Sequence, residues 1–411
     1  MTDRSPVPRA SGTAREVFRA FLLLGLTSFG GPVAHLGYYR TEFVARRRWL
    51  DETSYADLVA LTQFLPGPTS SQTGFAIGLL RAGLPGAFAA WIGFTLPSAA
   101  IMVALGLGLV AAGGLDAAWL SGLKIAALAI VAQAVWAMAV QLCPERRTRA
   151  FALVAAMIML AAGDALVQLL VIALAAWAGR LLLPAKSGEA NGGDDAQRRL
   201  PRGVALAAGI LFVLLIAGLP VAAALCPNPA LDLANAFVRA GALVFGGGHV
   251  VLPLLQSEMV APGHIGADAF IAGYGAAQAL PGPLFTIAGF LGSAIALPGW
   301  PGGIAGGALA LAAIFAPGFL LLLAAWPSWQ LLRRRPDLRR ALAGVNAAVV
   351  GLLLAAFYDP VWTSTIHGPL DLAMALSVLA LLVVARLPPW AVVAMALAAG
   401  AARAAWLPGA V

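Results

Sequence analysis

The chain has little charge, few cysteines and few histidines. Charged residues make up 11% of its 411 residues, whereas apolar residues make up 61%. A soluble domain of this length would need far more charge on its surface. The two cysteines, Cys143 and Cys226, and the four histidines have no spacing typical of a disulfide framework or of a zinc, haem or iron–sulfur site. We therefore expect no metal, no cofactor and no ordinary soluble fold.

The sequence contains long apolar runs without charged residues. The mean hydropathy is +0.88, and the runs 86–115, 203–226 and 302–325 contain no charged residue. A helix of about 20 apolar residues crosses the roughly 30 Å hydrocarbon core of a bilayer. A buried helix of a soluble core is the alternative for one run, but so many runs argue against it. The sequence predicts an all-α, polytopic integral membrane protein, surrounded by the lipid bilayer of the cytoplasmic (inner) membrane.

The basic residues lie in the gaps between the apolar runs. The net charge is +8, but this distribution is that of cytoplasmic loops under the positive-inside rule, not of a phosphate-binding face. We therefore expect no nucleic-acid partner. Residues 1–16 are polar and basic, with no small-residue cleavage site after the first apolar run. We interpret them as a cytoplasmic N-terminal tail that precedes an uncleaved membrane segment.

The sequence contains an internal duplication. Phe29-Gly30-Gly31 returns 216 residues later as Phe245-Gly246-Gly247, and the same offset relates Glu42 to Glu258. With one residue deleted, Gln63 and residues 65–68 (Leu-Pro-Gly-Pro) match Gln278 and residues 280–283, and further on Pro97 matches Pro317. Motifs in the same order, with offsets that change by only a few residues, indicate duplication rather than a chance match of glycine- and proline-rich sequence.

One apolar span separates the two copies. A hydrophilic stretch, 186–202, precedes the run 203–226. A single extra crossing between two even-numbered repeats would place them in opposite orientations, as in many secondary transporters. We thus predict two homologous, inverted-topology repeats, with a tail at 1–16, a first repeat at 17–183, a cytoplasmic linker at 184–202, a linking helix at 203–226 and a second repeat at 227–411.

Each repeat begins with two segments that contain a helix-breaking element. These elements are residues 29–32, 65–68, 245–248 and 280–283. Glycine favours turns, and proline cannot continue a helix. If the segments entered the membrane and turned back, the basic loop at 46–48 would lie inside and the loop 256–268, which has no Lys or Arg, outside. We therefore expect broken or re-entrant helices. Residues 38–50 fit either an interfacial helix or a solvated loop.

A helix that starts inside the protein is suited to binding an anion. Its N-terminus carries roughly half a positive charge and free N–H groups. Gly67-Pro68 suits such a start, and the polar run Thr69–Thr73 follows it. These side chains would bind a tetrahedral oxyanion, or would instead satisfy broken backbone and join helices. In the second copy Thr286 corresponds to Ser71, but its neighbours are apolar, so we expect most ligands from the first half.

Charged and titratable residues supply further candidates. Removing a dianion from water costs more free energy than helix dipoles supply, so we expect a fixed cation at the site. The candidates near membrane segments are Arg81, Lys124 and Arg239. Each of these would alternatively extend to an interface. The predicted substrate-binding residues are Gly30, Gly31, Gln63, Gly67, Thr69, Ser70, Ser71, Gln72, Thr73, Lys124, Arg239, Gly246, Gly247, Gln278, Gly282, Thr286 and Asn346.

Four residues are candidates for proton coupling: His35, Glu42, His249 and Glu258. Histidine titrates near neutral pH, and a carboxylate near a helix break could carry a proton. The alternatives are that the histidines are satisfied core residues and that the acids pair with nearby arginines.

The residues quoted above resemble those of the chromate ion transporter family in its long, two-domain form. The resemblance rests on Phe29–Pro32, Trp49-Leu50, the stretch from Gln63 to Gly74, and the second-half partners at 245–247 and 280–283. It covers nearly the whole chain. It implies chromate efflux that gives chromate resistance, with sulfate as a structural analogue and energy from the membrane potential or a proton gradient.

Other function classes stay open at this point. A sulfate importer on the same scaffold is the nearest alternative, because only the resemblance favours export. An anion channel would share broken helices. An intramembrane enzyme would need a nucleophile with a histidine, or clustered histidines and carboxylates, and no such pairing is found, so we expect no enzyme. The sequence leaves the oligomeric state open, with a homodimer among the alternatives.

Overall fold

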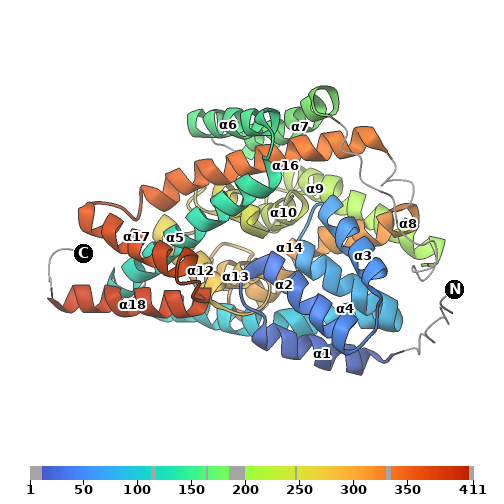
Figure 1. The fold of residues 1–411 in the computed structure, drawn as a ribbon, viewed down its shortest axis with the longest axis horizontal. Coiled ribbons are helices and arrows are strands. Elements are labelled where there is room, and N and C mark those ends of the chain that lie inside the picture. The colour runs from blue at the N-terminus through green and yellow to red at the C-terminus, as the bar shows by residue number, and fades with distance from the viewer. Residues whose placement is uncertain are drawn as a thin grey trace.

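The computed structural model describes residues 12–112, 117–162, 165–184, 200–245, 248–329 and 335–406. All regular elements within these ranges are helical, which confirms the all-α prediction (Figure 1). The tail at 1–11, most of the linker at 184–202, and Gly246 and Gly247 lie outside the described residues.

The first half consists of α1 (Ala14–Thr27), α2 (Gly31–Tyr39) with a π-helical continuation (Arg40–Arg46), α3 (Glu52–Phe64), α4 (Thr69–Ala111), α5 (Ala117–Leu142), α6 (Arg146–Ala161) and α7 (Ala165–Leu182). The linking segment consists of α8 (Arg202–Val213), a π-helical turn (Leu214–Gly218) and α9 (Leu219–Leu225). The second half consists of α10 (Pro229–Ala242), a 3₁₀ turn (Gly248–Val250), α11 (Val251–Met259), α12 (Ala267–Ala279), a 3₁₀ turn (Leu284–Thr286), α13 (Ile287–Ala294), α14 (Gly303–Ala325), a 3₁₀ turn (Trp326–Ser328), α16 (Pro336–Ala356), a π-helical turn (Phe357–Trp362), α17 (Pro369–Val383) and α18 (Pro389–Trp406).

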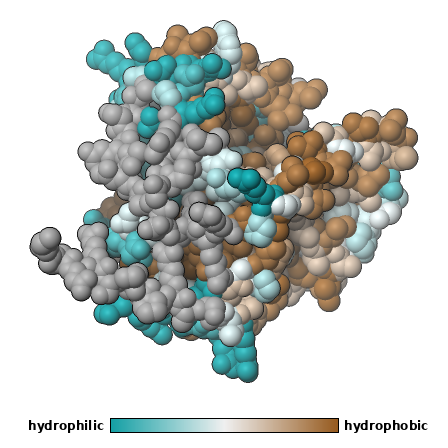
Figure 2. All heavy atoms as spheres, turned by 90° about the vertical axis from the view of Figure 1, so that its right-hand side faces the viewer, coloured by the Kyte–Doolittle hydropathy of each residue, from teal (hydrophilic) through white to brown (hydrophobic). Residues whose placement is uncertain are grey.

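Five helical stretches of the described residues are long and apolar enough to cross a membrane: Thr69–Ala111, Ser121–Leu142, Arg202–Leu225, Gly303–Ser328 and Pro336–Trp362. The linking stretch is the least buried of them. Of the 18-residue apolar segment taken from each stretch, 11% is buried in the linking stretch and 39–61% in the others. Side chains of the linking stretch, such as Leu206 and Leu225, point outward. Figure 2 shows hydrophobic surface over the right-hand part of one end of the molecule, beside hydrophilic surface at its upper left and lower edge. Soluble proteins seldom expose so much apolar surface, so the linking helix faces lipid.

The helices end at the glycine- and proline-containing elements where the sequence predicted breaks. α1 ends at Thr27 and α2 begins at Gly31, and α3 ends at Phe64 before α4 begins at Thr69. In the second half α10 ends at Ala242, and α12 ends at Ala279. A helix of 13 or 14 residues is about 20 Å long, shorter than the hydrocarbon core. The helices are therefore interrupted at the predicted positions, and their re-entrance into the membrane stays a prediction.

α4 is two helices rather than one. Ala82 and Gly83 have non-helical dihedral angles, and φ of Gly83 is +70°. After this turn the backbone folds back on itself, because a Cβ on Gly78 would lie 2.3 Å from the Gly86 carbonyl oxygen. The second half repeats the arrangement, since a Cβ on Gly292 would lie 2.4 Å from the Gly306 carbonyl oxygen. In each half a short helix is thus followed by a long helix whose backbone packs closely against it.

Within residues 38–50, the helical conformation extends to Arg46, and residues 47–50 are not helical. Tyr39, Phe43 and Leu50 are buried as the predicted common face, and the Phe43 ring stacks on Phe21 with centroids 4.8 Å apart. The apolar side of this segment therefore packs against α1.

The two halves exchange their last helical hairpins. α6 and α7 of the first half pack on α16 of the second, whereas α17 and α18 pack on α5 (Figure 1). α6 and α7 are consecutive helices that contact each other. α5 and α16, which are equivalent in sequence, contact each other and run in opposite directions across the molecule. Neither half could keep this packing without the other.

The exchanged packing depends on close backbone approach at glycine. A Cβ on Gly344 of α16 would lie 2.1 Å from the Ala175 carbonyl oxygen of α7, whereas a Cβ on Gly108 of α4 would meet no atom within 4 Å. Overpacking costs about 1–3 kcal/mol, whereas alanine is favoured over glycine in a helix by about 1 kcal/mol. We expect Gly344→Ala to lower the thermal unfolding temperature in detergent by roughly 3 °C or more. The matched variant Gly108→Ala should unfold at the same temperature as wild type or at a higher one. Equal effects of the two substitutions on the unfolding temperature would contradict the packing.

Candidate functional site

The four helix breaks lie together and are joined by two reciprocal hydrogen bonds. The Gly67 N–H donates to the Val244 carbonyl at 2.7 Å, and the Gly282 N–H donates to the Ser28 carbonyl at 3.0 Å. Gly67 and Gly282 are equivalent in the duplication, and so are Ser28 and Val244. The same interaction is therefore made twice, each time between the second break of one half and the first break of the other.

Both donor glycines are required by their backbone and by their surroundings. φ is +127° at Gly67 and +99° at Gly282, a region that other residues rarely adopt. A Cβ on Gly67 would lie 3.0 Å from Cα of Gly318, and a Cβ on Gly282 would lie 2.7 Å from Oγ of Ser98. Gly318 and Ser98 each follow the repeat-equivalent prolines 317 and 97. Each Pro-Gly-Pro loop thus fits against the long helix of the opposite half.

The first breaks of the two halves also face each other. A Cβ on Gly248 would lie 3.0 Å from Cγ of Pro32, and a Cβ on Gly31 would lie 3.8 Å from Nε2 of His249. The structure therefore brings together three of the predicted sites: the Gly30-Gly31 turn, the start of α4, and His249.

The polar run at the start of α4 divides into two groups. Gln72 and Thr73 join pieces of backbone: the Gln72 amide donates to the carbonyls of Pro66 (3.0 Å) and Gly318 (2.9 Å). The Thr73 hydroxyl donates to the Thr69 carbonyl and pairs with the Thr62 hydroxyl at 2.7 Å. These contacts are those of the structural alternative, while Oε1 of Gln72 is buried and makes no hydrogen bond among the described residues.

Ser70 and Ser71 form the other group. The Ser70 hydroxyl lies 3.3 Å from Nδ1 of His35, a residue that is 1% exposed. The Ser71 hydroxyl is buried and, among the described residues, makes no hydrogen bond. A buried hydroxyl without a partner costs free energy, so Ser71 has hydrogen-bonding capacity left at the N-terminus of a helix.

The second half contributes a different polar cluster, made of His249, Tyr274 and Gln278. The Gln278 amide nitrogen lies 3.0 Å from Nδ1 of His249 and donates to the Tyr274 hydroxyl at 2.8 Å. The Tyr274 hydroxyl lies 3.0 Å from the same Nδ1. The other ring nitrogen, Nε2, lies near Gly31, where an added Cβ would be 3.8 Å from it. Tyr274 was not predicted, because it has no counterpart in the first copy.

The remaining predicted residues differ from their repeat partners. Gln63 is exposed, although its equivalent Gln278 is buried. The Thr286 hydroxyl donates to the Pro283 carbonyl at 2.9 Å, and Asn346 is half-buried. Gly246 and Gly247 lie outside the described residues.

Every candidate cation is in an ion pair. Lys124 Nζ lies 2.7 Å from Asp268 of α12, Arg239 lies 2.6 Å from Glu258, and Arg81 lies 3.1 Å from Glu16. Glu42, the equivalent of Glu258, contacts both Arg46 and Arg47. Pairing with nearby arginines, the alternative considered for the two acids, is thus what the structure contains.

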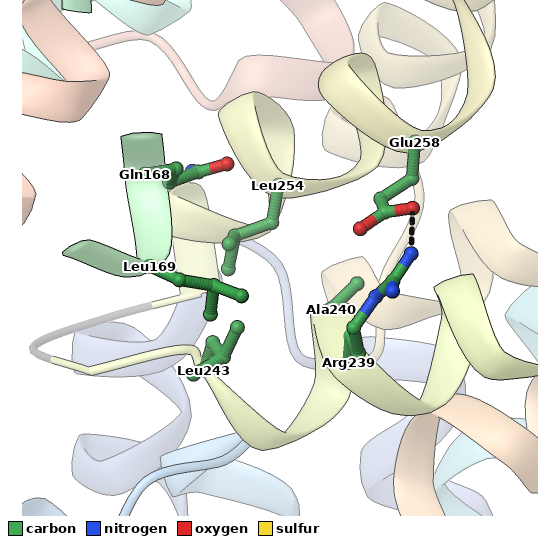
Figure 3. Close-up of a pocket in the computed structure, with 7 residues that line it drawn as sticks. All are labelled: Gln168, Leu169, Arg239, Ala240, Leu243, Leu254 and Glu258. Carbon is green, nitrogen blue, oxygen red and sulfur yellow. Dashed lines mark hydrogen bonds and ion pairs between the residues drawn. The ribbon is translucent and has the colours of Figure 1, made fainter. Parts of the chain in front are cut away.

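A small cavity adjoins the Arg239–Glu258 pair (Figure 3). Its volume is about 10 Å³, enough for one water molecule. The lining residues are Gln168, Leu169, Arg239, Ala240, Leu243, Leu254 and Glu258. Gln168, on the exchanged helix α7, belongs to no repeated motif and could not be predicted to meet this pair.

The two candidate glutamines of the first half provide a matched test. Gln72 is fully buried and bonds two carbonyls, whereas Gln63 is exposed. We expect Gln72→Leu to destabilise the protein by about 2 kcal/mol or more, because two buried carbonyls lose their donor. Gln63→Leu should leave stability within about 0.5 kcal/mol. Thermal unfolding in detergent, followed by tryptophan fluorescence, measures both; a stable Gln72→Leu protein would return this side chain to the list of ligand candidates.

The comparisons with known proteins identify the family. The model of the chromate transporter family matches residues 15–180 and 231–401, which indicates two repeated halves. A probable chromate transport protein of Synechococcus elongatus is 28% identical over 83% of this chain and 83% of its own length. Chromate transport proteins of Cupriavidus metallidurans and Pseudomonas aeruginosa are 26% and 29% identical, over 84% of this chain and 82% and 80% of their own lengths.

No solved structure matches the chain. The family is one of transporters and not of enzymes. The two matched segments cover more than half of the sequence and contain all four helix breaks. The chain therefore belongs to the chromate transporter family.

Proposed function

We propose that this protein is a secondary transporter that exports chromate across the cytoplasmic membrane and thereby gives chromate resistance, with sulfate as a competing analogue. The observation that carries the proposal is the meeting of four helix breaks at one place, joined by the Gly67–Val244 and Gly282–Ser28 hydrogen bonds. Non-helical backbone at membrane depth survives where protein or water covers it, and such breaks form the substrate sites of many carriers. The names of the relatives supply the substrate.

The first half provides the oxyanion ligands. The N-terminus of α4 offers backbone N–H groups, and the hydroxyls of Ser70 and Ser71 lie in its first turn. His249, whose Nε2 faces Gly31, supplies a donor from the second half. Helix dipoles contribute at most about 2 kcal/mol each, so a cation completes the site. Arg239 is placed for this role, in the last turn of α10 before the break.

The two halves lie in the membrane with inverted topology. The support is the single linking span at Arg202–Leu225, the opposite directions of α5 and α16, and the basic residues that follow the positive-inside rule. The N-terminus is then cytoplasmic, and the short helices around each break enter the membrane without crossing it. Inverted repeats joined by one helix favour alternating access over a channel. A sulfate importer is the second candidate and differs in direction.

Uptake into everted membrane vesicles distinguishes these functions. We expect vesicles that contain the protein to accumulate chromate from the bath, which corresponds to export from the cell, and sulfate to compete with it. The membrane potential supplies the driving force, because the lumen of an energised everted vesicle is positive. Accumulation of sulfate alone in right-side-out vesicles would favour the importer, and transport of neither anion would refute the proposal.

The repeat-equivalent residues Ser71 and Thr286 test which half binds the anion. The Ser71 hydroxyl has no protein partner among the described residues, whereas the Thr286 hydroxyl already bonds the Pro283 carbonyl. A lost hydrogen bond to a charged ligand costs about 1.5 kcal/mol or more, or about tenfold in affinity. Ser71→Ala should therefore raise the half-saturating chromate concentration about tenfold, and Thr286→Ala less than twofold. Equal effects would show that the two halves contribute alike.

A further inference from the structure

The cavity beside Glu258 is lined by donors that lack partners. The Gln168 amide nitrogen is buried in a residue that is 2% exposed, and it makes no hydrogen bond among the described residues; nor does the buried Nε of Arg239. The other end of the Gln168 amide accepts from the Ser257 hydroxyl at 3.1 Å, which holds the side chain in place. Figure 3 shows Gln168 on one side of the cavity and the Arg239–Glu258 pair on the other, with Leu254 between them, and the cavity has space for one water.

The two equivalent acids of the repeats differ in their partners. Both carboxylate oxygens of Glu42 are occupied, one by Arg47 and the other by Arg46 at 3.0 Å. Among the described residues Glu258 pairs with Arg239 alone, through Oε2. The side chain of Arg239 is 37% exposed and that of Glu258 is 12% exposed, so water reaches this pair. Glu258 can take up a proton with the loss of one ion pair, whereas Glu42 would lose two.

We propose that Glu258 is the proton-carrying carboxylate of this transporter and that Arg239 exchanges between Glu258 and the transported anion. A water in the cavity that adjoins the pair delivers the proton. This inference rests on the function proposed above, and it names the coupling residue that the sequence left open among four candidates.

The proposed step conserves atoms and charge. A hydronium in the cavity gives one proton to Oε1 of Glu258 and becomes water, and the carboxylate becomes a neutral acid. The Coulomb attraction that holds Arg239 is lost, so the guanidinium is available to the oxyanion. Anion and proton then bind together. A dianion that travels with one proton moves one negative charge, which the inside-negative membrane potential drives outward.

Among the described residues that line the cavity, Glu258 is the only carboxylate. α10 contributes Arg239 and α7 contributes the uncharged Gln168, and α16, which also packs on α11, adds no residue to the cavity lining. His249, in the turn before α11, is bonded to Tyr274 and Gln278. Asp359 approaches α11 only through its carbonyl, which accepts from Gln256.

Proton movement during transport tests the assignment. Purified protein is reconstituted in vesicles with a pH-sensitive dye in the lumen and the membrane potential clamped with potassium and an ionophore. Chromate is then added outside. Wild type should acidify the lumen as chromate enters. Glu258→Gln, which mimics the protonated acid, should reduce chromate-dependent acidification at least tenfold and keep chromate counterflow exchange within about threefold. Chromate's own protonation affects both proteins equally and cancels in the comparison.

Glu42→Gln is the matched control and should retain the acidification. Wild-type chromate entry without acidification, or acidification unchanged in Glu258→Gln, would overturn the inference and leave the proposed function intact; absence of chromate transport by wild type would instead refute the function itself. If Glu258→Gln does not fold, Gln168→Leu replaces it. This variant keeps the ion pair, and we expect it to slow acidification about fivefold more than counterflow. An equal effect on both would refute the role of the cavity.

Discussion

The structure depends on one constraint, which is that every backbone group at a helix break must find a partner inside the protein. Breaking a helix at membrane depth frees carbonyls and N–H groups that lipid cannot satisfy. Here the carbonyls of Ser28 and Val244 accept from Gly282 and Gly67 of the opposite half. Each half therefore depends on the other for one hydrogen bond at a break. The exchange of hairpins follows the same logic on a larger scale. α6 and α7 pack on α16, and α17 and α18 pack on α5. This packing buries each half's long helix against the other half.

Within this symmetric frame the two halves have diverged in chemistry. The amide of Gln72 bonds Gly318, but its equivalent Ile287 is apolar. Instead the second half has the cluster of His249, Tyr274 and Gln278. A carrier with two equal sites would hold its anion on the pseudosymmetry axis. Unequal halves allow one to hold the anion and the other to respond to protons, which is the division of roles that we propose.

Local signals in the sequence were sufficient for the spans and the breaks, since glycine and proline act on their own backbone, and the duplication was visible as ordered motifs. The partners of the charged residues could not be predicted in this way. Lys124 meets Asp268, 144 residues away, and Gln168 meets Ser257, 89 residues away; both contacts join one half to the other. The polar run Thr69–Thr73 was correctly placed at a helix start, but its division into structural and free side chains depends on Gly318 and Thr62, which only the folded chain brings there.

The ion pairs change how the fixed cation must be understood. A guanidinium waiting unpaired in a dry site would be costly, and a buried pair is only weakly stabilising because desolvation offsets most of its attraction. Arg239 can therefore leave Glu258 at small net cost if another anion takes the carboxylate's place. A dianion that does so leaves Glu258, whose side chain is 12% exposed, charged and unpaired, which is unfavourable unless the acid takes up a proton. Anion binding and proton binding are then linked by the electrostatics of one pair, without any requirement for a long-range pathway.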